Sequence, residues 1–287
     1  MPHLYVRQMQ VLRVKLSNLF KKQIWRSPEE IIQIAFQRAS VVMMNEAHSG
    51  WKRCIRTRKI GRRILTVAHQ VGVRHLAMEA LFPEFAEKCN HTRRVLEGDL
   101  GYLSQPEMKE FIQTALDLGW TLIPYEADAF KWLALKHGID FSNSDDPNEK
   151  AQQLQEFQSE FTTLEYTNWR EEQQALNLLK TLQSLTRKTP LLVWCGNNHH
   201  SKQIRDDWIP MGYQFQQHSG MNPFVIDQIR TVSFHQNEYQ TRLIKKFADE
   251  LYNCGGTAGF LIEEAPALLR GDDSEDAILL SIQNELE

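Results

Sequence analysis

The hydrophobic positions of this chain alternate between short continuous runs and longer segments with helical spacing. Four runs have the length of strands and are rich in apolar residues: SVVMMNE, RHLAMEAL, WTLIPYEAD and TPLLVWCG. Such runs are typical of strands that are buried on both faces, as in a parallel sheet. Because amphipathic segments separate them, the pattern indicates βαβ units. We therefore expect an α/β fold with a mostly parallel central sheet and helices on both faces.

Local signals mark the ends of the predicted helices. Ser27 suits an N-cap, Pro28 follows at the first helical position, and Glu30 completes a capping box. Gly72 and Gly119 follow two amphipathic segments and predict their C-terminal ends. Besides the helix that starts at Pro28, helices are expected over Arg56–Val71, Pro106–Leu118 and Asn168–Leu185.

The pattern is weaker toward the C-terminus. Extra short strands are predicted in YQFQQH, PFVIDQI and GTAGFLIEEA, and a helix in EYQTRLIKKFADELY. No internal repeat or linker divides the sequence, so residues 1–287 are expected to form a single α/β domain. Within it, residues 1–26 are expected to be a basic N-terminal appendage, and residues 138–168 a polar insertion that is partly helical.

Composition narrows the class of protein. Hydrophobic residues make up 42% of the chain and charged residues 24%, which is typical of a soluble globular protein. No uninterrupted apolar run reaches about 18 residues, and no secretory signal precedes the domain, so no membrane span is expected. The cysteines form no C-x-x-C pair, which argues against a zinc ribbon or a disulfide framework. A cytoplasmic location fits these features.

The charge is unevenly distributed. Residues 1–63 contain 14 Lys and Arg against 3 Asp and Glu, and many of the basic residues lie in WKRCIRTRKIGRR. Such a cluster can attract phosphate or nucleic acid. However, Ile60, Ile64 and Val67 recur at helical spacing, which favours a solvated basic face on an amphipathic helix. Apart from Trp51, no aromatic residue is interleaved with the arginines, so a nucleic-acid partner is not expected.

Ionisable residues follow each of the four predicted strands. They are Glu46 and His48 after the first, Glu79 after the second, Glu126 and Asp128 after the third, and His199 and His200 after the fourth. Because parallel sheets bind ligands at the carboxyl ends of their strands, we expect these groups to share one cleft. They could provide a histidine base, a carboxylate that orients it, or ligands for a divalent metal. Since no G-x-S-x-G motif is present, water is the preferred nucleophile.

The order of these motifs resembles the erythromycin esterase, ChaN and Tiki-like superfamily over about residues 28–205. The matching elements are E-x-H, LAMEA, REEQQALN and VWCGNNHH. The resemblance implies that four catalytic residues meet in one cleft and would also be the ligands if a metal is used: Glu46, His48, Glu79 and His199. On the helix, Arg170 and Asn177 resemble the R-x-x-x-x-A-x-N pattern of the esterases, and seven-residue spacing places them on one face. We expect these two residues, with Glu126 and Asp128, to bind substrate.

The branches of this superfamily imply different chemistry. In the resemblance, the esterases activate water with a histidine, Tiki-like members are metal-dependent peptidases, and the ChaN branch binds haem. Asn45 stands where the superfamily usually has a glycine before the first Glu. The E-x-H spacing is nearer that of the haem-binding branch than the E-x-x-H of the esterases. The lack of an export signal favours the esterases, so we expect a hydrolase of an ester or amide, acting on a small molecule or peptide. The alternative is a non-enzymatic haem- or metal-binding protein with ligands among His48, His199 and His200.

Overall fold

A computed structural model gives the fold. It describes residues 24–47, 51–96, 101–138, 152, 154–185, 189–229, 231–232, 249, 251–265 and 274–282. His48 lies outside the described residues, as do most of the predicted N-terminal appendage and much of the 138–168 insertion. No helix in the described part of the chain is long and apolar enough to cross a membrane.

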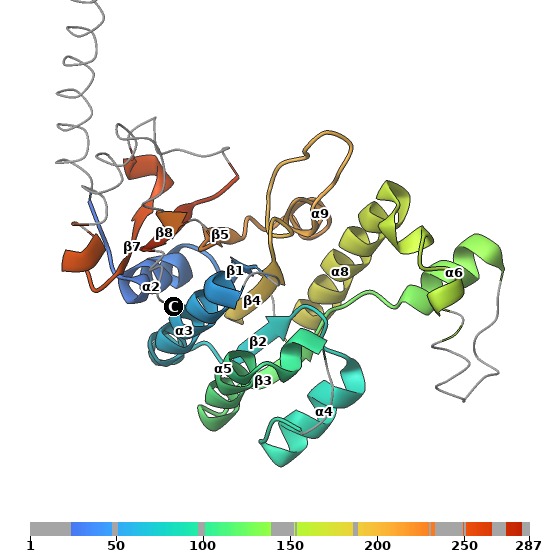
Figure 1. Ribbon diagram of the computed structural model, residues 1–287, viewed down its shortest axis with the longest axis horizontal. Helices are drawn as coiled ribbons and strands as arrows, with labels where there is room; N and C mark the ends of the chain where they lie inside the picture. The colour runs from blue at the N-terminus through green and yellow to red at the C-terminus, as the bar shows by residue number, and fades with distance from the viewer. Residues whose placement is uncertain are drawn as a thin grey trace, which may run out of the picture.

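The described strands form a single sheet in the order β3-β2-β4-β1-β5-β8-β6, with β7 paired to β8 (Figure 1). All neighbours are parallel except β7 and β8, which are antiparallel. The predicted α/β fold with a mostly parallel sheet is therefore confirmed. The strands are β1 Val41–Glu46, β2 His75–Met78, β3 Thr121–Pro124, β4 Leu191–Gly196, β5 Phe224–Asp227, β6 Thr231–Val232, β7 Thr257–Leu261 and β8 Ala277–Ile282.

Two layers of helices cover the sheet. One contains α2 (Pro28–Arg38), α3 (Trp51–Gln70) and α5 (Pro106–Asp117), and the other contains α8 (Leu164–Leu185) and α9 (Met211–Ser219). Side chains of β1 alternate between the layers. Val42 and Met44 pack in the cluster that includes α2, α3 and α5, whereas Val41 and Met43 pack in the cluster that includes α8 and α9. This alternation follows from the two-residue period of a strand and decides where each strand-end residue points.

The expected capping box begins α2. The Glu30 amide donates to Ser27 Oγ over 3.2 Å, and the Ser27 amide donates to the Glu30 carboxylate over 2.7 Å. Further along, Gly61 lets α3 approach the sheet closely. A Cβ atom at this position would lie 2.8 Å from the Trp194 ring and 2.9 Å from Phe111. Any larger residue here would push α3 away from β4 and disturb the strand ends that it covers.

Several predicted elements differ from the structure. YQFQQH lies within helix α9 and is not a strand, because Pro210 begins a helix that buries Met211 and Phe215, spaced by four residues. The sequence reading also missed α4 (Pro83–Thr92), α6 (Ala129–His137) and strand β8. The strands expected in PFVIDQI and GTAGFLIEEA are confirmed as β5 and β7. Most of the helix predicted in EYQTRLIKKFADELY lies outside the described residues.

The segments that follow β1 to β4 diverge at the carboxyl ends of these strands. β1 and β2 lead into helices of the α3 layer, whereas β3 and β4 lead toward α8 and α9. Since β2 lies between β3 and β4, the chain leaves these neighbouring strands toward opposite faces. Such a divergence forms the crevice in which open α/β sheets bind ligands.

Candidate functional site

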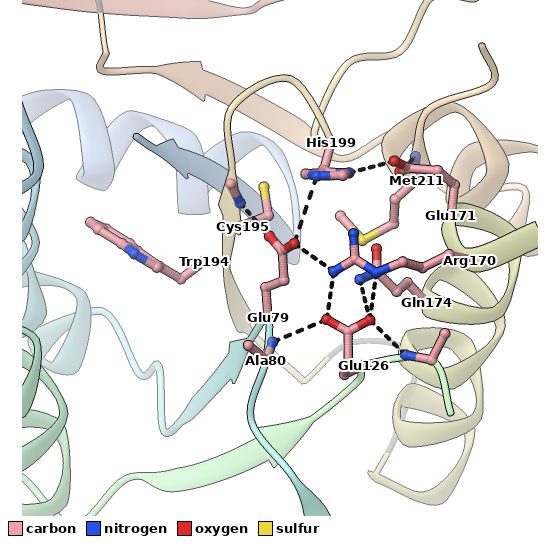
Figure 2. Close-up of polar contacts among 12 residues, drawn as sticks. Glu79, Ala80, Glu126, Arg170, Glu171, Gln174, Trp194, Cys195, His199 and Met211 are labelled. Carbon is pink, nitrogen blue, oxygen red and sulfur yellow. Dashed lines mark hydrogen bonds and ion pairs between the residues drawn. The ribbon is translucent and has the colours of Figure 1, made fainter. Parts of the chain in front are cut away.

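Glu79 follows β2 and points toward α8. Leu76 and Met78 face the α3 layer, so strand alternation sends the next odd-numbered side chain to the other face. One Glu79 oxygen accepts a hydrogen bond from the Gly196 amide, and the other lies 2.7 Å from Arg170 Nη2 (Figure 2). The residue is 4% exposed, so this carboxylate relies on its partners for the solvation that it loses.

Arg170 on α8 joins Glu79 to Glu126. Its Nε and Nη2 donate to the two Glu126 oxygens over 2.8 and 2.6 Å, a bidentate pair (Figure 2). Burial opposes the charge of the guanidinium, but Glu126 and Glu79 outweigh it and raise the Arg170 pKa. Arg170 is therefore a fixed positive charge between two carboxylates.

Backbone groups hold Glu126 in place after β3. Its oxygens accept from the amides of Ala80 and Ala127 over 3.2 and 2.9 Å, and from Gln174 Nε2 over 2.9 Å. Ala80 adopts a left-handed conformation with φ of 57°, which is uncommon for a residue with a side chain. The strained turn after Glu79 thus supplies a donor to Glu126 and links the ends of β2 and β3.

His199 lies between two carboxylates. The tight turn after β4 includes Asn197, whose φ is 35°, and brings the imidazole toward α8. His199 Nδ1 bonds to Glu171 Oε1, and Nε2 lies 3.6 Å from Glu79 Oε1 (Figure 2). Burial lowers the His199 pKa, but Glu79 and Glu171 more than offset this, so the pKa is raised overall.

Glu171 is a functional candidate that the sequence reading did not single out, although it lies in REEQQALN. Its side chain is fully buried, and besides His199 it accepts hydrogen bonds from Trp208 Nε1 over 3.1 Å and from the Met211 amide over 2.6 Å. The sequence does carry one signal for Glu171, which is its position on the helix. Glu171 precedes Ala175, Leu178 and Leu182 on the buried stripe of α8, where a carboxylate is costly unless it has partners.

Glu46 does not join this cluster. As the last residue of β1, it follows Val42 and Met44 on the α3 side of the sheet. Its two oxygens accept from Arg58 Nε and Nη2 over 3.0 and 3.3 Å, and both side chains are fully buried. The expectation that all four strand ends share one cleft is therefore wrong for Glu46. Strand alternation separates it from Glu79.

Two further candidates hold backbone in place. Asp128 is the N-cap of α6 and accepts from the Phe130 amide over 3.0 Å. Asn177 Nδ2 donates to the carbonyl oxygens of Tyr125 and Glu126 over 3.2 and 3.1 Å. Asn177 thereby ties α8 to the end of β3 and helps to place Glu126.

Asn45 and His200 belong to a separate buried region. Asn45 Nδ2 donates to Asp227 over 3.0 Å, and its side-chain oxygen accepts from the Gln228 amide over 2.8 Å, which joins the ends of β1 and β5. His200 is 1% exposed, and burial lowers its pKa to about 4. Adjacent residues thus diverge after β4. The structure brings His199, and not His200, to Glu79.

The carboxylates of the site are unsuited to a metal. No group of three or more His, Cys, Asp or Glu residues is arranged to hold an ion in the described part of the chain. Glu46 is bound to Arg58, while Glu79 is shared between Arg170 and the Gly196 amide. Carboxylates that are neutralised by arginine are poor metal ligands, so the expected metal set of Glu46, Glu79 and His199 does not fit this geometry. The remaining expected ligand, His48, lies outside the described residues.

A pocket of about 840 Å³ lies beside the cluster. Its lining comes from the start of α4, the segment from β3 to α6, and one face of α8; we call it the α8 pocket. Arg170 lines it and also bonds to Glu79, whereas Glu79 and His199 themselves are not among its lining residues. Arg170 therefore connects the His199 cluster to the pocket.

No protein-family model matches the sequence, and no curated protein does either. Among solved structures, a Bacillus cereus protein is similar with a TM-score of 0.58 at 11% identity, over 91% of this chain and 94% of its own. A histidine mutant of the erythromycin esterase EreC in its open conformation has a TM-score of 0.54 at 10% identity, over 90% and 97%. ChaN of Campylobacter jejuni, solved with cofacial haem, has a TM-score of 0.49 at 12% identity, over 91% and 97%. The similarity to the erythromycin esterase confirms, at the level of the fold, the resemblance read from the motifs.

Proposed function

We propose that this protein hydrolyses an ester or amide, using His199 to activate water. The observation that carries the proposal is the placement of one imidazole between a buried carboxylate at Nδ1 and a second carboxylate near Nε2. A carboxylate that accepts a hydrogen bond from Nδ1–H fixes the tautomer, so Nε2 of the neutral ring carries the lone pair. The similarity of the fold to that of an erythromycin esterase is consistent with this chemistry.

In the proposed reaction, His199 Nε2 takes a proton from water while the water oxygen bonds to the substrate carbonyl carbon. The carbonyl π electrons move onto its oxygen, giving a tetrahedral intermediate. When this intermediate collapses, the bond to the leaving alcohol or amine breaks, and the leaving group takes the proton from Nε2. Glu79 Oε1, 3.6 Å from Nε2, stabilises the imidazolium that forms between these steps.

Arg170 is positioned to stabilise the oxyanion. Its Nε and Nη2 bond to Glu126 and Glu79, whereas Nη1 makes no hydrogen bond to any residue that the structure describes. A charged donor that is held rigidly by two carboxylates can face developing negative charge without having to reorganise. The α8 pocket beside Arg170 would then hold the rest of a small-molecule or peptide substrate.

The test compares two neighbouring glutamates of α8. Glu171→Gln removes the charge that orients His199, and kcat/KM toward p-nitrophenyl esters and peptide p-nitroanilides should fall about 10³-fold or more. Glu172→Gln is the matched control, because Glu172 is partly exposed and pairs with His218 instead. Its kcat/KM should equal that of the wild type.

His199→Ala provides an independent test of the same step and should lower kcat/KM by about 10²-fold or more. Circular dichroism and thermal melts would verify that both variants fold. Wild-type turnover in folded Glu171→Gln or His199→Ala protein would refute the proposal, as would a wild type that hydrolyses none of these substrates.

A further inference from the structure

Trp208 lies on a closed turn between β4 and α9. The Arg205 amide donates to the Trp208 carbonyl oxygen over 3.1 Å, and the Trp208 amide donates to the Arg205 carbonyl oxygen over 3.0 Å. Within the turn, Asp206 has a φ of 51°, in the left-handed region that residues with a side chain rarely adopt. Such a conformation persists only where the surrounding structure holds it. The turn therefore restricts the backbone from which the Trp208 side chain extends.

Asn168 on α8 fixes the backbone on both sides of Trp208. Its Nδ2 donates to the Asp207 carbonyl oxygen over 2.9 Å, and its Oδ1 accepts from the Ile209 amide over 2.8 Å. One side chain thus bonds to the residue before Trp208 and to the residue after it. Because Asn168 and Glu171 are three residues apart, they are neighbours on one face of α8. The two bonds of Asn168 therefore hold the indole beside Glu171.

The indole donates to the carboxylate oxygen that also bonds to His199. Trp208 Nε1 lies 3.1 Å from Glu171 Oε1, and His199 Nδ1 bonds to the same oxygen. The other oxygen accepts from the Met211 amide over 2.6 Å. Figure 2 shows Glu171 reaching from α8 to the imidazole. With donors at both oxygens, the carboxylate has one orientation in which all three hydrogen bonds form.

The indole also contacts the imidazole directly. The ring centroids of His199 and Trp208 are 6.0 Å apart, and the two ring planes are nearly perpendicular, at 86°. This is the edge-to-face arrangement that aromatic rings favour. Trp208 thus restrains His199 in two ways, through the ring contact and through the shared oxygen of Glu171.

Trp208 is separate from the surface that would hold substrate. Neither Trp208 nor Asn168 lines the α8 pocket, whereas the neighbouring residues Trp169 and Arg170 do. A change at Trp208 should therefore alter the base without altering the pocket. This separation predicts an effect on kcat and little effect on KM.

The indole also influences how tightly the imidazole holds its proton. The charged groups around the ring are Glu79, after β2, and Arg170 and Glu171, on α8. The adjacent His200 stays neutral near pH 7, because burial lowers its pKa to about 4. A neutral donor at Glu171 Oε1 competes for that oxygen and so weakens the attraction of the carboxylate for the imidazolium. Without this donor, His199 should bind its proton more tightly.

We propose that Trp208 is a positioning residue for His199, holding the imidazole toward the reacting water through Glu171 and through the ring contact. The inference rests on the proposed function, in which His199 is the general base. Trp208 does not touch the reacting atoms in this scheme and acts by fixing the groups that do. An imidazole that is already held in its reactive orientation loses little freedom on reaching the transition state.

Trp208→Phe tests the proposal, because it removes the donor and keeps an aromatic ring. With p-nitrophenyl esters, kcat should fall about tenfold, while KM should stay within about twofold of the wild-type value. The matched control is Trp132→Phe. Trp132 is buried and its Nε1 makes no hydrogen bond to any described residue, so the same change there removes no bonded donor. This control should leave kcat unchanged.

An NMR titration gives a second readout that does not require hydrolysis. The imidazole Cε1 proton, assigned by comparison with His199→Ala, reports the pKa of His199. In Trp208→Phe the midpoint should rise by about 0.5–1 pH unit, the equivalent of one net hydrogen bond, and the acidic limb of the kcat/KM profile should rise with it. In Trp132→Phe the midpoint should stay in place.

Asn168→Ala is a second variant that keeps the indole and frees the backbone that carries it. Its kcat should fall about threefold. Unchanged kcat or an unmoved His199 titration in folded Trp208→Phe protein would overturn the proposal. If Trp208→Phe does not fold, unchanged kcat in Asn168→Ala would overturn it instead. A wild type that hydrolyses no substrate refutes the hydrolase, and the titration still decides whether Trp208 acts on the Glu171–His199 pair.

Discussion

Two glutamate–arginine pairs lie on opposite faces of the same sheet, one at the end of β1 and one after β2, the two strands that flank β4. In the Glu46–Arg58 pair both side chains are 0% exposed. In the Glu79–Arg170 pair the glutamate side chain is 5% exposed and the arginine side chain 23%. The residue types are the same, but the first pair is sealed by the α3 layer and the second borders a pocket. Residue type and strand position therefore do not separate a sealed ion pair from one that borders a pocket.

The difference lies in how the charges are shared. Glu46 directs both oxygens to one arginine. Arg170 instead divides its donors between Glu79 and Glu126, and Glu79 also lies near His199. Arg58 also donates to the neutral Gln105 side chain, so losing Glu46 removes the carboxylate that faces a fully buried guanidinium. In the open cluster, each charge retains other partners after a single change. The same substitution should thus affect stability at one site and activity at the other.

The largest effect on stability is expected at the sealed pair. Glu46→Gln leaves Arg58 charged and fully buried, so the free energy of unfolding should fall by about 3–5 kcal/mol. Urea denaturation, followed by circular dichroism, measures this loss. The double variant Glu46→Gln/Arg58→Met removes both charges and should recover most of it. A Glu46→Gln protein as stable as the wild type would contradict the dependence of the buried Arg58 charge on the Glu46 carboxylate.

Glu79→Gln makes the same chemical change at the open cluster and should have the reverse outcome. Arg170 keeps Glu126 as a partner, so stability should change little, while kcat/KM should fall about 10²-fold, which is about 2.7 kcal/mol of transition-state stabilisation. In the proposed reaction His199 acts as its neutral form, so activity rises with pH through its raised pKa.

Removing the Glu79 charge should lower the His199 pKa and move the acidic limb of the kcat/KM profile to lower pH. A pH series of initial rates with wild type and Glu79→Gln provides this measurement. If the acidic limb of the kcat/KM profile lies at the same pH in both proteins, His199 is not the titrating base, even if the variant is slow.

The smallest effect is expected for His200, the histidine that is not part of the His199 cluster. His200 is buried, and this burial lowers its pKa to about 4. The unfolded chain binds a proton near pH 6.5 and the folded protein does not, so stability falls as pH decreases from 6.5 toward 4. Between pH 7 and pH 5 this histidine should cost about 2 kcal/mol.

His200→Leu should abolish that loss and leave kcat/KM close to the wild-type value. Denaturation at pH 7 and pH 5 of both proteins isolates the contribution of His200, because His199 is present in each. The raised pKa of His199 acts with the opposite sign, since it stabilises the fold below pH 6.5. Equal pH dependence in the two proteins would contradict the buried neutral state of His200.

Much of the secondary structure was readable because its signals are local. The capping box at Ser27 and the apolar runs of β1 and β4 depend on neighbouring residues, and the structure confirms them. The strand predicted in YQFQQH is instead part of α9, because the helical signal depends on the N-cap Pro210 and on Met211 and Phe215, which are buried four residues apart. β8 was not among the predicted strands, although its run AILLSI is apolar; its pairing with β5, β6 and β7 joins segments far apart in the chain.

By itself, the sequence determined the α/β order, the strand ends, and the presence there of Glu79, Glu126 and His199. The tertiary structure decided which of these groups meet. Whether a strand-end side chain faces α3 or α8 depends on register and alternation, and this separated Glu46 from Glu79. The role of Glu171 emerged in the same way, because its partners His199, Trp208 and Met211 come from a segment beyond β4. The sequence shows a carboxylate on an apolar helix stripe, but only the folded chain shows which hydrogen-bond donors stabilise it there.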